Sequence, residues 1–135
     1  MALKIWASLA LLCVCHSVLV EAVLAEVGDP VRGQAVFLDR DLGHCVLCHQ
    51  VSSLGVPFQG NIGPDLSNVG QRLSRKDLWD KIADPTVSNS ESTMPAYHRT
   101  SDLRQVQPEY LGKPILSQAE LNDLVAYLQT LRDAP

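Results

Sequence analysis

The sequence of 135 residues predicts an all-α fold of short helices and long loops. Three segments begin with a helix-capping signal and continue with apolar residues at helical spacing. No comparable segment alternates apolar and polar residues as a half-buried strand would. Two segments between the predicted helices, 50–70 and 84–97, are rich in Gly, Pro, Ser and Asn, a composition typical of loops.

The first predicted helix starts at Asp29, which caps it, with Pro30 at the first helical position. Its apolar residues are spaced for one face, and we expect that face to pack inward: Val31, Ala35, Leu38 and Leu42. The second helix starts with a capping box of Ser74 and Asp77 and ends by Pro85.

A second capping box, formed by Ser117 and Glu120, opens the most strongly predicted helix. Leu116 before the box and Leu121 within the first turn form a hydrophobic staple. The apolar residues of this helix are spaced three and four apart: Leu121, Leu124, Val125, Leu128 and Leu131. The spacing predicts an amphipathic helix near the C-terminus.

The first 25 residues have the pattern of a secretory signal peptide. Lys4 precedes an apolar run from Ile5 to Val20, and the segment ends at Ala25 with small-residue spacing suited to cleavage. An uncleaved anchor is the alternative, but the run is shorter than the roughly 20 apolar residues that a membrane span needs. We expect a cleaved signal peptide over 1–25, a single domain over 26–135, export to the periplasm and no membrane attachment.

The composition limits the partners and the size of the core. The chain has 15 acidic and 11 basic residues, a formal net charge of −4, and no basic run, so nucleic acid and anionic membranes are unexpected partners. A chain this short builds only a modest core, and small exported domains usually add a disulfide, a metal or another staple.

Only two of the four cysteines lie after the predicted signal, in the run Cys45-Val46-Leu47-Cys48-His49. A thioredoxin-like redox pair would need a βαβ context, and no β-rich segment precedes Cys45. A structural zinc site would need a fourth ligand, for which only His44 and the distant His98 are available. A disulfide at this spacing is sterically awkward and closes almost no loop.

The remaining interpretation is covalent attachment of a haem. Three residues make about one turn, so both sulfurs of Cys45 and Cys48 reach one macrocycle while His49 turns its imidazole beneath the iron. Export agrees with this interpretation, because haem of this type is attached after translocation. We therefore expect one covalently bound haem c, with iron held by His49.

A second axial ligand is expected from Met94, the only methionine after the predicted signal. Its thioether would raise the reduction potential of the haem. The alternative role is a flexible core filler, but Met94 lies in a polar, Pro-flanked stretch with no helical apolar period. His98 is the rival ligand. His44 is poorly placed because its neighbour Cys45 is tethered to the porphyrin edge.

The two loops also agree with a bound haem. Long structureless loops are uncommon in a compact domain unless they surround a ligand. The apolar faces of the haem would then complete the core, with Val, Leu and Phe side chains from both loops packing on them. The fold expected is therefore a set of short helices and long loops wrapped around one covalent haem.

Several motifs together resemble a class I cytochrome c over nearly the whole chain after the signal. They are Gly33 with Phe37, "CVLCH", "GPDL" at 63–66, a later Met-Pro and "LVAYL" near the C-terminus. The resemblance implies that the terminal helices cross at Gly33 and that the Pro64 carbonyl accepts a hydrogen bond from His49. It also implies thioether links at Cys45 and Cys48, with His49 and Met94 as the axial ligands.

A narrower resemblance rests on "PFQGNIGPDLSNVGQR", "TMPAYHR" and "YLGKPILSQAELNDLVAYLQTLR". These segments are similar to the SoxX family, the small monohaem subunits of the SoxAX sulfur-oxidation cytochromes. The resemblance implies a larger SoxA-like haem subunit as partner, which holds the reactive cysteine of an L-cysteine S-thiosulfotransferase complex. Thiosulfate is coupled there to a cysteine of a sulfur-carrier protein, and the small subunit passes electrons to an acceptor cytochrome. We expect no catalytic residue in this chain.

Two other functions remain as alternatives. A free soluble electron-carrier cytochrome c of the periplasm would have the same haem site, although such carriers typically surround the haem edge with lysines. Only Lys76, Lys81 and Lys113 follow the signal. A cytochrome-type peroxidase would need a second haem or an open iron position, which one CxxCH motif and a spare methionine disfavour.

Overall fold

The computed structural model describes residues 27–132, and the predicted all-α class is confirmed for this part of the chain. It contains four α-helices and four 3₁₀ turns and no strand. In order these are α2 (Pro30–Leu38), η1 (Cys45–Leu47), η2 (Ser52–Leu54), α3 (Val69–Arg72), α4 (Arg75–Ala83), η3 (Pro85–Val87), η4 (Pro108–Tyr110) and α5 (Gln118–Thr130). The predicted signal peptide lies outside the described residues.

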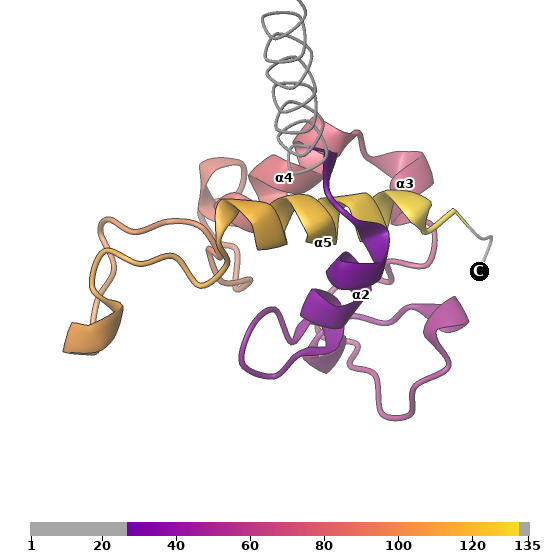
Figure 1. Cartoon of the computed structure of the whole chain (residues 1–135), viewed down its shortest axis with the longest axis horizontal. Helices are drawn as coiled ribbons and strands as arrows, with labels where there is room; N and C mark the ends of the chain where they lie inside the picture. The colour runs from indigo at the N-terminus through magenta and orange to yellow at the C-terminus, as the bar shows by residue number, and fades with distance from the viewer. Residues whose placement is uncertain (1–26, 133–135) are drawn as a thin grey trace, which may run out of the picture.

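The first and last described helices, α2 and α5, cross and form the centre of the fold (Figure 1). At the crossing a Cβ atom added to Gly33 would lie only 2.5 Å from the carbonyl carbon of Asp123 and 2.8 Å from Cβ of Tyr127. A side chain larger than hydrogen would therefore push the helices apart. The expected crossing of the terminal helices at Gly33 is confirmed.

The predicted start of α2 is correct, but the predicted inward face is correct only at Leu38 and Leu42, which are partly buried against the core. Asp29 caps the helix, because its carboxylate accepts hydrogen bonds from the backbone N–H groups of Val31 and Arg32. Val31 is 76% exposed and Ala35 is also exposed, whereas Gly33, Val36 and Phe37 are buried. The face that carries Gly33 is buried because α5 packs closely against it.

Both predicted capping boxes are present. In α4 the Ser74 hydroxyl accepts from the Asp77 N–H, and the Asp77 carboxylate accepts from the Ser74 N–H. Ser117 and Glu120 make the same pair at the start of α5. These reciprocal bonds satisfy N–H groups that the first helical turn leaves without partners. Every residue of the predicted apolar face of α5 is buried: Leu121, Leu124, Val125, Leu128 and Leu131.

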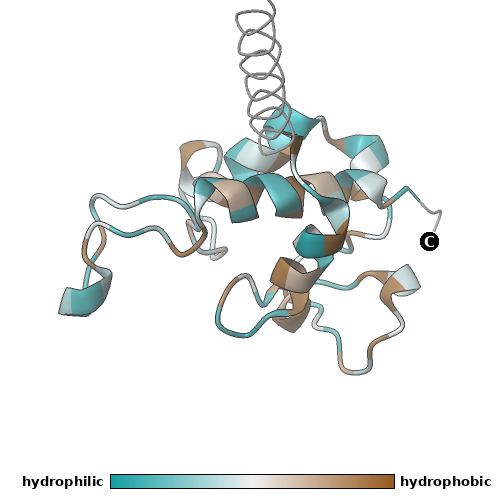
Figure 2. Ribbon diagram, in the orientation of Figure 1, coloured by the Kyte–Doolittle hydropathy of each residue, from teal (hydrophilic) through white to brown (hydrophobic). Residues whose placement is uncertain are grey.

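The loops leave the helical centre in two directions. The segment between α2 and α3 lies to one side of the helices, and the segment 99–115 extends away from them as an arm that carries η4 (Figure 1). Figure 2 shows apolar stretches along the first of these loops. Within residues 27–132, no helix is long and apolar enough to cross a membrane.

Candidate haem site

The CxxCH segment folds into the single turn that its spacing predicts. The backbone N–H groups of Cys48 and His49 both donate to the Cys45 carbonyl, at 3.1 and 2.9 Å. His44, just before the turn, has a left-handed backbone with φ 43°. The turn brings the side chains of Cys45, Cys48 and His49 to the edge of one cavity.

Three backbone hydrogen bonds join this turn to the following loop. The N–H groups of Gly60, Gly63 and Leu66 donate to the carbonyls of Val46, Cys48 and Gln50, at 2.9, 2.8 and 2.9 Å. A Cβ atom on Gly60 would lie 2.5 Å from the carbonyl carbon of Leu47. The close approach therefore requires glycine, and it holds the loop against the CxxCH turn.

The His49 ring is held by Gly63 and Pro64. Its Nδ1 donates to the Pro64 carbonyl at 2.8 Å, as the resemblance implies. A Cβ atom on Gly63 would lie 2.6 Å from Nδ1 and 2.7 Å from Nε2, so only glycine leaves room for the ring. Because Nδ1 carries the proton in this bond, Nε2 is the nitrogen with a free lone pair for a metal.

The cavity has a volume of about 810 Å³ and lies between the helical core and the two long loops. Core side chains of α2, α4 and α5, such as Phe37, Leu78 and Leu124, form apolar walls. Cys45, Cys48, His49 and Met94 all line it as well. This volume lies within the range of roughly 300–1,000 Å³ that is typical of ligand pockets.

The lining residues fit a covalently attached haem. The cavity combines apolar walls for the macrocycle with two thiols, one imidazole and one thioether. Cys45 and Cys48 are not joined to each other, and burial raises the pKa of Cys45 to about 12. Among residues 27–132, no group of three His, Cys, Asp or Glu side chains is arranged to hold a metal ion.

Met94 lies in the segment 84–98, which we call the Met94 loop. The loop returns to the body at Tyr97, whose hydroxyl donates to the Gly43 carbonyl at 2.9 Å, two residues before Cys45. Burial raises the pKa of Tyr97 to about 12, so this phenol stays protonated over the ordinary pH range. Tyr97 lines the cavity, and neither its role nor that of Gly43 was expected from the sequence.

His98, the rival ligand, is not among the residues that line the cavity. Its Nδ1 donates to the Leu116 carbonyl at 2.8 Å, and its ring packs edge-on against Trp79. His44 does line the cavity, beside Cys45. Phe58, expected to pack on the haem, is 99% exposed and is not among the residues that line the cavity.

The sequence provides only a partial indication of the role of Gly63 and Pro64. The pair Gly63-Pro64 belongs to the "GPDL" motif, but nothing local in the sequence shows that Gly63 makes space for an imidazole.

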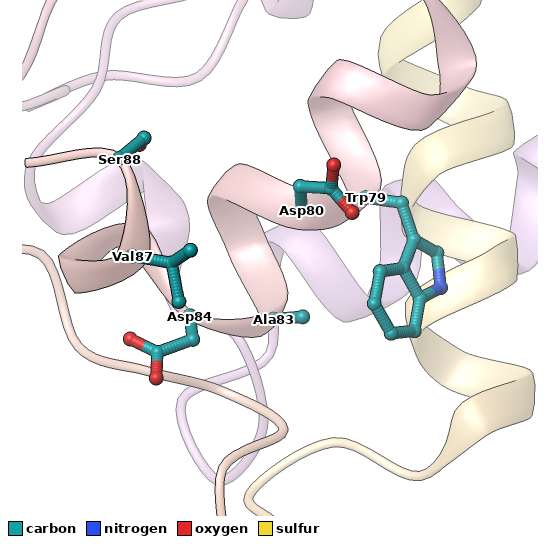
Figure 3. A pocket seen from close by; sticks show the side chains of 6 residues that line it. All are labelled: Trp79, Asp80, Ala83, Asp84, Val87 and Ser88. Atoms are coloured by element: carbon teal, nitrogen blue, oxygen red, sulfur yellow. The ribbon is translucent and has the colours of Figure 1, made fainter.

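A smaller pocket of about 320 Å³ lies along α4 and η3, between Trp79 and Val87 (Figure 3). None of the predicted site residues lines it.

Comparison with known proteins agrees with this site. The cytochrome c family profile matches residues 30–132. The crystal structure of SoxXA from P. pantotrophus contains a chain that is 31% identical, with a TM-score of 0.72, and the match covers 78% of this chain and 83% of that chain. No curated protein gives a significant match. The protein belongs to the cytochrome c family, as a class I c-type cytochrome that binds one covalent haem c and transfers electrons.

Proposed function

We propose that this cytochrome is the small monohaem subunit of a thiosulfate-oxidising SoxXA-type complex. The observation that carries the proposal is the similarity to a chain of the SoxXA structure, at 31% identity. Because the match covers similar shares of both chains, 78% and 83%, the two chains are of similar length. The similarity therefore extends over most of both chains.

Cys45 and Cys48 are the proposed sites of the thioether links, and His49 and Met94 are the proposed axial ligands. When bound, haem c supplies a one-electron redox couple. His49 is oriented by its hydrogen bond to Pro64 and by the space that Gly63 leaves. A thioether ligand such as Met94 favours the reduced iron and so raises the reduction potential.

The proposed reaction divides the work between two subunits. After the predicted signal this chain has only Cys45 and Cys48, both assigned to haem attachment, so it keeps no cysteine to attack thiosulfate. A larger SoxA-like haem subunit would hold that cysteine and couple thiosulfate to a sulfur-carrier protein. This chain would take up the released electrons and pass them to an acceptor cytochrome. It would act in the periplasm, after removal of residues 1–25.

Purification under native conditions tests the assignment to a complex. The tagged protein, expressed in its own host, should elute with a larger chain that also carries covalent haem. Thiosulfate and a sulfur-carrier protein together should then reduce the haem of this chain, and neither should do so alone. A chain that elutes by itself and is not reduced by thiosulfate in this way would instead be the free electron carrier of the alternative.

The assignment of Met94 is tested separately with the haem-loaded protein. Met94→Ala should remove the weak sulfur-to-iron absorption at the red end of the oxidised spectrum and lower the reduction potential, because a thioether that favours ferrous iron is lost. His98→Ala is the matched comparison. If the unchanged protein shows no such band, or if Met94→Ala keeps it, Met94 is not the ligand.

A further inference from the structure

The Met94 loop is closed where it leaves and rejoins α4. The N–H groups of Tyr97 and His98 donate to the carbonyls of Ile82 and Ala83, each at 3.1 Å. These carbonyls belong to the last turn of α4, where the helix offers no N–H partners of its own. The residues directly after Met94 are thus joined to the C-terminal end of a helix.

The His98 side chain adds a second attachment, to the start of α5. Leu116 donates its N–H to the Tyr97 carbonyl at 2.9 Å, and its own carbonyl accepts from His98 Nδ1 at 2.8 Å. Leu116 is fully buried and directly precedes the Ser117 cap of α5. A buried carbonyl without a partner is costly, so this imidazole is not easily replaced by an apolar side chain.

The surroundings of His98 restrict its ring further. Trp79 of α4 packs edge-on against it, with ring centroids 5.9 Å apart. Figure 3 shows Trp79 on α4, with Ala83 further along the same helix. The bond to Leu116 also joins residues 18 apart in the sequence, across the base of the arm. One side chain therefore links the Met94 loop, α4 and the start of α5.

We propose that His98 is a positioning residue for Met94, which it serves by holding the return of the loop against α4 and α5. The inference rests on the proposed role of Met94 as a haem ligand. Only Pro95, Ala96 and Tyr97 separate the two residues, so loss of the His98 side chain removes one of the attachments that hold the chain on the C-terminal side of Met94. Loops with few buried contacts open locally at low cost, and this attachment raises that cost.

Displacement of the Met94 sulfur by added imidazole measures how firmly the loop holds Met94. The test uses the oxidised, haem-loaded protein and follows the red sulfur-to-iron absorption during an imidazole titration. His98→Leu removes the donor to Leu116, and His98→Asn keeps an N–H donor near the position of Nδ1. Leu131→Ala, a core change outside the cavity, controls for general loss of stability.

His98→Leu should lower the imidazole concentration for half displacement about tenfold, the size expected when a buried carbonyl loses its partner. His98→Asn should restore most of this affinity difference, and Leu131→Ala should leave the titration unchanged even though it lowers the melting temperature. The inference is overturned if His98→Leu behaves like the unchanged protein, if Leu131→Ala has an equal effect, or if His98→Asn gives no rescue.

Failure of the ligand assignment would look different. If Met94→Ala keeps the red absorption, Met94 is not the ligand, and both the assignment and the inference that rests on it are wrong. If Met94→Ala loses the absorption while His98→Leu titrates like the unchanged protein, the ligand assignment stands and only the positioning role is wrong. The two outcomes are therefore separated by one spectrum.

Discussion

Gly63 and Tyr97 show how single residues shape the haem site. Gly63 makes room for the His49 imidazole, because a Cβ atom at this position would lie 2.6 Å from Nδ1. Tyr97 fixes the return of the Met94 loop through its bond to the Gly43 carbonyl. Neither residue is a proposed ligand, but Gly63 contacts the His49 ring and Tyr97 lies in the Met94 loop. Both contacts join residues far apart in the sequence.

We expect Gly63→Ala to displace the His49 ring and to weaken its hydrogen bond to Pro64. Steric crowding of this kind costs about 1–3 kcal/mol. The haem-loaded variant should show a lower melting temperature and a changed ring signal of His49 in NMR spectra. Gly55→Ala is the control, because Gly55 has φ 65° but nothing within 4 Å of its added Cβ. Equal changes at the His49 ring in both variants would contradict the steric role.

The raised pKa of Tyr97 predicts a loss of stability at high pH. Burial moves its pKa from 10.0 to about 12, so the folded protein keeps this proton after the unfolded chain has lost it. The contribution of Tyr97 is thus complete below pH 10 and disappears as the pH rises towards about 12. Denaturant unfolding of the haem-loaded protein should be less steeply pH-dependent in this range for Tyr97→Phe. An unchanged slope would contradict the prediction.

The crossing of α2 and α5 organises the secondary-structure elements. Gly33 allows the close approach of the two helices, and an ion pair next to it also joins them. Arg32 donates from Nε and Nη2 to the two carboxylate oxygens of Asp123, at 2.7 and 2.9 Å. The Asp29 N–H also donates to this carboxylate. Asp123 is only 5% exposed, so its charge is buried but fully partnered.

Gly33→Val should separate the two helices and lower the free energy of unfolding by about 3 kcal/mol, the upper part of the usual range for overpacking. Chemical denaturation of the haem-loaded protein measures the change. Gln34→Val places the same side chain on the exposed side of α2 and should cost well under 1 kcal/mol. If the two variants are equally stable, the close approach at Gly33 does not govern the crossing.

The molecule as a whole is a small helical core around a large cavity. The cavity of about 810 Å³ takes its apolar walls from the core itself. A bound haem would fill it and join the loops to the helices, which explains how long Gly- and Pro-rich loops can be part of an ordered domain.

Loss of both thiols should therefore unfold the protein. We expect Cys45→Ser or Cys48→Ser alone to weaken covalent attachment, and the double variant to be colourless and largely unfolded. Circular dichroism and absorption spectra of the exported protein measure both properties. A well-folded, colourless double variant would show that the helical core is stable without the haem.

Local sequence patterns determined the helix starts and the CxxCH turn. Asp29, Ser74 and Ser117 cap their helices as predicted, and Cys45 to His49 forms one turn. Each of these features depends on hydrogen bonds between residues at most four positions apart. Such bonds form wherever the local chain permits them, so a pattern in the sequence is sufficient to predict them.

Only the tertiary structure decided which surfaces meet. It buries the Gly33 face of α2 instead of the Val31 face, leaves Phe58 in solvent, and places Met94 but not His98 on the cavity. The apolar spacing in α2 favoured the Val31 face, and both Met94 and His98 were possible ligands by chemistry. The choice between them depends on contacts between distant segments, which are set by steric fit at the helix crossing and by the path of the loop, and no local pattern encodes either.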